Sequence, residues 1–216
     1  MLDQPAQRKS VLVMSRKNQQ IVVIHGGTTF NTYKDYISFL KNREISLDKL
    51  RLQRDWKDTL TEKLSEDFDV LSPRMPNGIN ARYKEWKIWF ERIIPFLSKD
   101  VIFIGHSLGG IFLAKYLSEN TISKTIKATI LVAAPFDDAN SEESLADFKL
   151  SSSLAKFSEQ SGIIYLIHSK DDPIVPFEQL EKYKQALPNS KTIILDNREH
   201  FNQEAFPEII KLIRTL

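Results

Sequence analysis

The sequence contains no cysteine among its 216 residues, so disulfides, thiolate nucleophiles and cysteine-ligated zinc are excluded. No apolar run approaches the length of a membrane span, and residues 1–10 lack the apolar stretch of a secretory signal peptide. The patterns Gly-x-Gly-x-x-Gly, Gly-x-x-x-x-Gly-Lys and His-Glu-x-x-His are missing as well. These absences predict a cytoplasmic protein with no membrane span, no cofactor and no metal.

An excess of charge of one sign is also absent. The 30 basic and 28 acidic residues are interspersed and give a net charge of +2. Without a stripe of Lys and Arg, nothing indicates nucleic-acid binding. Hydrophobic residues make up 42% and charged residues 27%, as in ordinary globular proteins, and the length favours a single domain over residues 1–216.

Short runs rich in Val and Ile alternate with longer amphipathic segments. This pattern predicts an α/β protein with a mostly parallel, doubly wound sheet of about six strands, flanked by helices. The expected strands are Ile21–Ile24, Phe68–Leu71, Val101–Ile104, Ala128–Ala133, Ile163–His168 and Thr192–Leu195, with a further antiparallel edge strand at Val11–Met14. The expected helices are Trp56–Leu64, Ala81–Leu97, Leu108–Glu119, Phe177–Leu187 and Gln203–Leu216.

Two segments do not fit a simple strand-helix repeat, residues 30–55 and 137–160. Both are interpreted as cap-like insertions that shape a pocket, because loops after strands carry the sites of such folds. In the helix expected at Ala81–Leu97, five apolar residues form a stripe that predicts a face packed on the sheet: Trp86, Trp89, Phe90, Ile93 and Phe96.

The sharpest motif is Gly105-His106-Ser107-Leu108-Gly109-Gly110, between an expected strand and an expected helix. This context is that of a nucleophile elbow, in which Ser107 is held in a strained conformation. The positions two before and two after the serine must be small, and Gly105 and Gly109 meet that need. The helix start also directs free N–H groups at the place where an oxyanion would form.

A serine hydroxyl needs a base within hydrogen-bond reach, and the chain has four histidines. His25 and His168 end expected strands, and the side chain of His106 should point away from the serine beside it. His200 lies in a loop after a late strand, in the chain order Ser, Asp, His that this kind of site requires. His200 is therefore the predicted base.

The orienting acid should follow a strand between the serine and the histidine. Asp172 stands three residues before the Val175-Pro176 pair and is the favoured acid, whereas Asp171 is expected to cap the turn. Asp137 or Asp138, after an earlier strand, remain alternatives.

Backbone N–H groups must also stabilise the oxyanion. The expected donors are those of Leu108, after the serine, and Gly27, in the Gly-Gly turn after the first strand, with Thr28 as a second choice.

The Ser107 elbow, the Asp-Asp-Pro loop at 171–173 and Glu-His-Phe at 199–201 resemble those of small α/β-hydrolases related to the retinoblastoma-binding serine hydrolases. This resemblance covers most of the chain from Ile21 onward. It implies the α/β-hydrolase fold, the triad named above, carboxyl-ester hydrolysis and no cofactor. The sequence departs from the simplest members in its long segment 30–55 and in Glu199, where a Gly often precedes the histidine.

The sequence thus predicts a serine hydrolase acting on a small-molecule acyl substrate, with a carboxylic ester preferred. A thioester or amide substrate stays open, since all share the acyl-transfer step. A different class also stays open: a protein-binding module on a hydrolase scaffold, although no sequence feature supports a protein partner.

Overall fold

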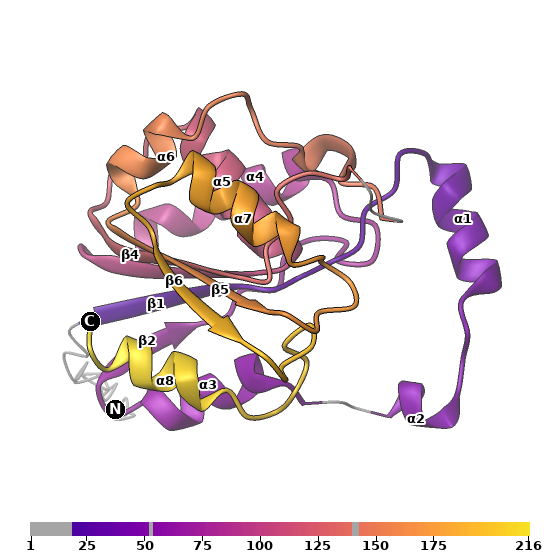
Figure 1. The fold of residues 1–216 in the computed structure, drawn as a ribbon, viewed down its shortest axis with the longest axis horizontal. Coiled ribbons are helices and arrows are strands. Elements are labelled where there is room, and N and C mark those ends of the chain that lie inside the picture. The colour runs from indigo at the N-terminus through magenta and orange to yellow at the C-terminus, as the bar shows by residue number, and fades with distance from the viewer. Residues whose placement is uncertain (1–18, 52–53, 140–142) are drawn as a thin grey trace, which may run out of the picture.

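The computed structural model describes residues 19–51, 54–139 and 143–216. At its centre is a six-stranded sheet in the order β2-β1-β3-β4-β5-β6, with every neighbouring pair parallel (Figure 1). The strands are β1 (Gln19–Ile24), β2 (Phe68–Leu71), β3 (Val101–His106), β4 (Ile126–Val132), β5 (Ile163–Ser169) and β6 (Lys191–Leu195). The direction in which successive strands are added to the sheet reverses between β1 and β3. In open α/β sheets, ligands bind at the carboxyl ends of the two strands on either side of such a reversal.

Helices cover both faces of the sheet. On one face lie α3 (Trp56–Leu64) and α8 (Pro207–Ile213), and on the other lie α4 (Tyr83–Ile93), α5 (Leu108–Glu119), α6 (Ala155–Gln160) and α7 (Glu178–Ala186) (Figure 1). Side chains of β1 alternate between the two layers. Val22 and Ile24 join the core under α5, whereas Ile21 and Val23 join the core under α3 and α8.

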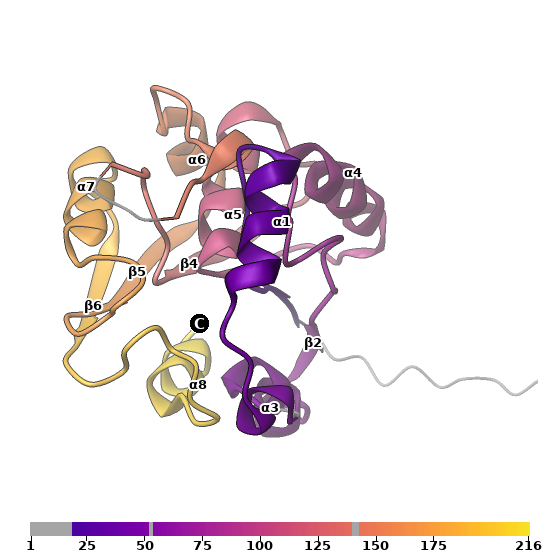
Figure 2. The same cartoon turned by 90° about the vertical axis from the view of Figure 1, so that its right-hand side faces the viewer.

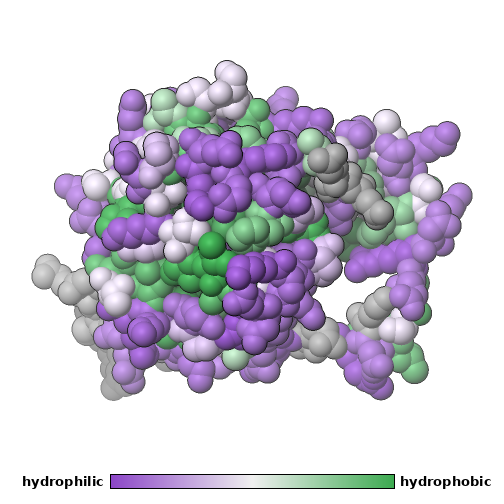
Figure 3. Space-filling model, in the orientation of Figure 1, coloured by the Kyte–Doolittle hydropathy of each residue, from purple (hydrophilic) through white to green (hydrophobic). Residues whose placement is uncertain are grey.

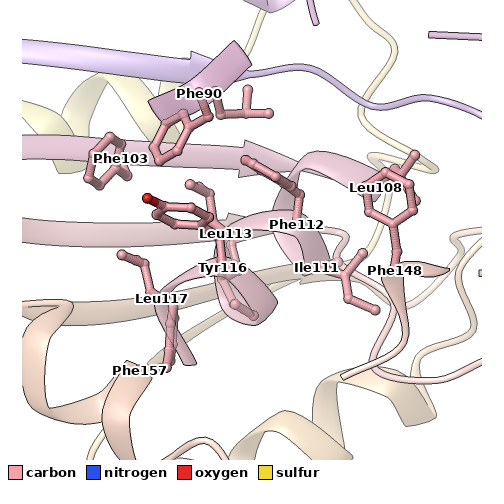
Figure 4. Close-up of a cluster of buried hydrophobic side chains, with 14 of the residues drawn as sticks. Phe90, Phe103, Leu108, Ile111, Phe112, Leu113, Tyr116, Leu117, Phe148 and Phe157 are labelled. Atoms are coloured by element: carbon pink, nitrogen blue, oxygen red, sulfur yellow. The ribbon is translucent and has the colours of Figure 1, made fainter. Parts of the chain in front are cut away.

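The core on the α5 side is rich in aromatic residues. Phe90 of α4 and Phe112 of α5 meet edge to face, with ring centroids 5.4 Å apart, and Phe103 of β3 completes the contact (Figure 4). All six residues of β3 are buried. This packing fixes the strand and helix on either side of Ser107.

All six strands predicted between Ile21 and Leu195 are present, with ends shifted by at most two residues. The five predicted helices are present too, although the last one is shorter and begins at Pro207. The edge strand predicted at Val11–Met14 lies outside the described residues.

The predicted apolar stripe on α4 is only partly correct. Trp86 and Phe90 are fully buried, but the side chains of Trp89 and Phe96 are 43% and 81% exposed. Pro95 lacks an N–H and a 3-10 turn, η1 (Ile94–Phe96), replaces the α-helix there, which takes Phe96 off the helical stripe. Trp89 lies next to the buried Phe90 in sequence, and adjacent helical residues do not share a face.

Residues 30–51 form an arm that stands beside the body, with α1 (Tyr33–Asn42) and α2 (Leu47–Leu50) (Figures 1 and 2). The space-filling view shows an opening between this arm and the body (Figure 3). A capping box between Thr32 and Asp35 begins α1, yet α1 contains no buried residue.

Residues 143–160 lie against the body instead. They include the 3-10 turn η2 (Ala146–Phe148) and α6, and Phe148 and Phe157 are fully buried in the core. Among the described residues, none of the helices combines the length and the apolar composition needed to cross a membrane.

Candidate active site

Ser107 lies between β3 and α5 with φ 54° and ψ −122°. A residue with a side chain rarely adopts a positive φ, so the surrounding structure must hold this conformation. The glycines make it sterically feasible: a Cβ on Gly105 would lie 2.5 Å from the carbonyl oxygen of Gly109. The predicted nucleophile elbow therefore has the strained geometry and the close strand-helix approach that such a turn needs.

His200 and Asp172 form a buried pair. His200 Nδ1 lies 2.9 Å from Oδ2 and 3.1 Å from Oδ1 of Asp172. The Asp172 side chain is completely buried, and its Oδ1 also accepts the backbone N–H groups of Ile174 (2.8 Å) and Val175 (2.9 Å). Because the carboxylate only accepts, the proton of the pair belongs on Nδ1, which leaves Nε2 free to act as a base.

The other candidate acids have different partners. Asp171 accepts from the Ser169 hydroxyl and from the Glu199 N–H, and the Ser169 contact is the main reason why its pKa lies below the ordinary value. Asp137 pairs with Lys182 at 2.6 Å, and Asp138 pairs with Lys149 at 3.0 Å. Only Asp172, among these four, contacts His200.

Ser107 and His200 line the same cavity, which has a volume of about 460 Å³. The structure contains no hydrogen bond from Ser107 Oγ to His200 Nε2, whereas apo catalytic sites often tighten only when substrate binds. Arg43 of the arm and Glu143 also line this cavity, as does the N-cap of α3, Asp55. Both segments interpreted as insertions thus contribute walls to it.

The two expected oxyanion donors lie in the same region. Leu108 begins α5, so its N–H has no acceptor within the helix. Gly27 lines the cavity, and a Cβ there would lie 2.7 Å from Gly78 O. The second choice, Thr28, was wrong. Its N–H does not point to an oxyanion because it already donates to Gly78 O at 2.9 Å.

A second, narrow cavity of about 30 Å³ adjoins Ser107. Its walls include Leu108, Leu145, Ile174 and Val175. Thr29, Ser144 and Gln179 also line it, so the site has a small recess of mixed polarity next to a wider space, and Ser107 lines both.

The three remaining histidines have hydrogen-bond partners other than Ser107. His25 Nε2 accepts the Met75 N–H at 2.8 Å, and His168 Nε2 donates to Val175 O at 2.9 Å. His106 points away from the serine, as predicted, and its Nε2 lies 2.8 Å from His200 O. Burial lowers the pKa of all three imidazoles. Lys57, which also lines the larger cavity, was not found from the sequence because no local motif marks it.

The described residues contain no cluster of three or more His, Cys, Asp and Glu side chains that could hold a metal ion. A family model described as "Serine hydrolase" matches residues 51–214, which is most of the chain. The chain belongs to this serine hydrolase family. No protein with a curated description matches the sequence.

Solved structures similar to this serine hydrolase have the same fold. The ydeN gene product of B. subtilis has a TM-score of 0.73 and 20% identity, covering 91% of this chain and 97% of its own. A putative YdeN-like hydrolase from Pectobacterium atrosepticum has a TM-score of 0.63 and 17% identity, covering 91% and 89%. The thioesterase domain of a curacin biosynthetic pathway has a TM-score of 0.61 and 13% identity, covering 92% and 91%.

These comparisons establish a small serine hydrolase with the α/β-hydrolase fold. They do not test the narrower resemblance to retinoblastoma-binding serine hydrolases, which stays a prediction.

Proposed function

We propose that the protein hydrolyses small carboxylic esters through an acyl-enzyme on Ser107, with His200 as base and Asp172 as orienting acid. The observation that carries this proposal is the buried His200–Asp172 pair, whose His200 lines one cavity with a serine held at positive φ.

In the first step Ser107 Oγ attacks the ester carbonyl and its proton passes to His200 Nε2. Asp172 stabilises the imidazolium, and the N–H groups of Leu108 and Gly27 donate to the oxyanion. The C–O bond to the alcohol then breaks, and the alcohol leaves with the proton from His200. Water repeats the sequence on the acyl-enzyme and releases the acid.

The size of the two cavities favours a short acyl chain. The recess beside Leu108, with a volume of about 30 Å³, is much smaller than the cavity on which His200 opens, and we assign the acyl chain to it. The alcohol part would extend into the cavity of about 460 Å³, which the arm borders through Arg43. The cytoplasmic location and the single domain expected from the sequence stay predictions.

A fluorophosphonate probe and p-nitrophenyl acetate together test the proposal. The wild-type protein should be labelled on Ser107 and should turn over the ester, while Ser107→Ala should lose both properties. Ser118→Ala is the matched control, because Ser118 lies on the same helix and only bonds back to Ala114 O. Full turnover by Ser107→Ala would refute the mechanism, and a folded wild type that neither reacts nor turns over would favour the binding module.

A further inference from the structure

The loop that carries His200 has an unusual backbone. Glu199 and Phe201, on either side of the histidine, both have positive φ, 45° and 55°. Non-glycine residues at positive φ are strained and persist only where neighbouring contacts hold them. The position of His200 therefore depends on what fixes the backbone between these two residues.

Two buried side chains hold this backbone. Trp56 Nε1 donates to Phe201 O at 2.9 Å, and His106 Nε2 lies 2.8 Å from His200 O. The rings of His106 and His200 lie 5.0 Å apart. Both anchors are buried, so water does not replace them readily.

The chemistry of the His106 contacts fixes its tautomer. A carbonyl oxygen only accepts, so Nε2 must carry the proton that it donates to His200 O. Lys57 Nζ, which only donates, lies 3.3 Å from His106 Nδ1, so Nδ1 must be unprotonated. Burial and the nearby Lys57 ammonium lower the pKa of His106 well below its usual value, which is consistent with a neutral ring.

The Lys57 ammonium is in turn held by its own surroundings. It lies 2.5 Å from Asp55 Oδ2 and 5.0 Å from the ring centre of Trp56. Its side chain is 14% exposed. Asp55 is fixed because it caps α3 through Lys57 N. A continuous chain of contacts thus runs from Asp55 through Lys57 and His106 to the backbone of His200.

We infer that Lys57 and His106 are positioning residues that set the tautomer of the His106 ring and hold the His200 backbone in place, so that the base faces Ser107. The expected effect on turnover rests on the proposed function, whereas the tautomer of His106 and the position of the His200 backbone do not. Lys57 acts through His106 and does not need to contact the substrate.

Lys57→Met should lower kcat by about tenfold to a hundredfold with little change in KM, because a misplacement near 1 Å can cost about a hundredfold in rate. Lys115→Met is the matched control. Lys115 has the same 14% exposure, a carboxylate partner in Glu119 at 2.8 Å and the Tyr83 ring at 4.9 Å, but it is remote from His200. A raised KM with unchanged kcat in Lys57→Met would mean that Lys57 binds substrate, and would overturn the inference.

A second pair of variants separates positioning from folding. His106→Gln can keep a donor near His200 O and should retain more of kcat than His106→Phe, which has none. Equal kcat values in two folded variants of matched thermal stability would contradict the role assigned to this bond.

Imidazole ¹⁵N shifts provide a readout that does not depend on turnover. In the wild type at pH 7, His106 should be neutral with its proton on Nε2, and Lys57→Met should weaken that preference and shift the backbone signals of residues 199–201. A proton on Nδ1 of His106 in the wild type would overturn the inference. An inactive wild type with the expected tautomer would instead remove only the proposed esterase function.

Discussion

Replacing Gly105 by alanine tests whether the elbow depends on the close approach of β3 and α5. A Cβ at this position would lie 2.5 Å from Gly109 O, 2.6 Å from Gly110 Cα and 2.7 Å from the Gly109 carbonyl carbon. All three are backbone atoms in the first turn of α5. No rotation of a side chain can relieve the overlap, so the helix itself has to move.

The distances set the size of the effect. Ordinary contact begins at 3.4 Å, so the closest pair must separate by about 0.9 Å (3.4 minus 2.5). Overpacking of this kind costs about 1–3 kcal/mol. Each kcal/mol lowers Tm by about 2–4 °C in a protein of this size, so Tm should fall by roughly 2–12 °C. Because α5 carries Leu108 N, kcat/KM should fall by about a hundredfold.

Thermal unfolding followed by circular dichroism and turnover of p-nitrophenyl acetate measure the two effects. Gly78→Ala is the control, because a Cβ there meets only His25 Cε1, at an ordinary 3.4 Å. It should change Tm by little. If Gly105→Ala matched the wild type in both Tm and kcat/KM, the steric reasoning for the elbow would be wrong.

Three further predictions follow from the site. Short acyl esters should be turned over faster than octanoyl esters, because the recess beside Leu108 is narrow; faster turnover of the octanoyl ester would count against this assignment. Asp172→Asn should reduce kcat about 10⁴-fold, as loss of the orienting acid does in other triads, whereas Asp171→Asn should leave most of it. Stability to urea should fall as the pH drops below about 6.5, since burial lowers the pKa of His25, His106 and His168 and the unfolded chain then binds more protons. Each such histidine contributes a slope of up to about 1.4 kcal/mol per pH unit, so His106→Gln should flatten the curve by at most this amount.

The sheet could be predicted from the sequence because parallel strands are buried on both faces. They then appear as short runs of Val and Ile, as at Ile21–Ile24, and can be recognised without knowing which strands lie beside them. The exposed face of α4 was harder, because Trp89 is apolar and lies next to the buried Phe90. Composition alone does not tell which aromatic side chains the next layer will cover.

The candidate site likewise contains features that the sequence predicts and features that it does not. Ser107, Asp172 and His200 follow strands, and the elbow motif, the chain order of this fold and the spacing of Asp172 to Val175-Pro176 favour them, although chain order alone left Asp137 and Asp138 as alternatives. The contact of His106 with His200 O joins residues 94 positions apart, and depends on the tautomer set by Lys57. Thr28 was an acceptable donor in sequence terms until its N–H was found to be bonded to Gly78 O.

In the proposed mechanism, the residues that would select the substrate and those that position the base belong to different segments of the chain. The arm borders the cavity through Arg43, but α1 has no buried residue, so changes in its sequence cost little core packing. The contacts that hold His200 begin at Asp55, where the chain has returned to the body and entered α3. In the proposed mechanism the arm can therefore vary in length and composition, and so change which alcohol group is accepted, while the Lys57–His106 contact holds the proposed base His200 in place.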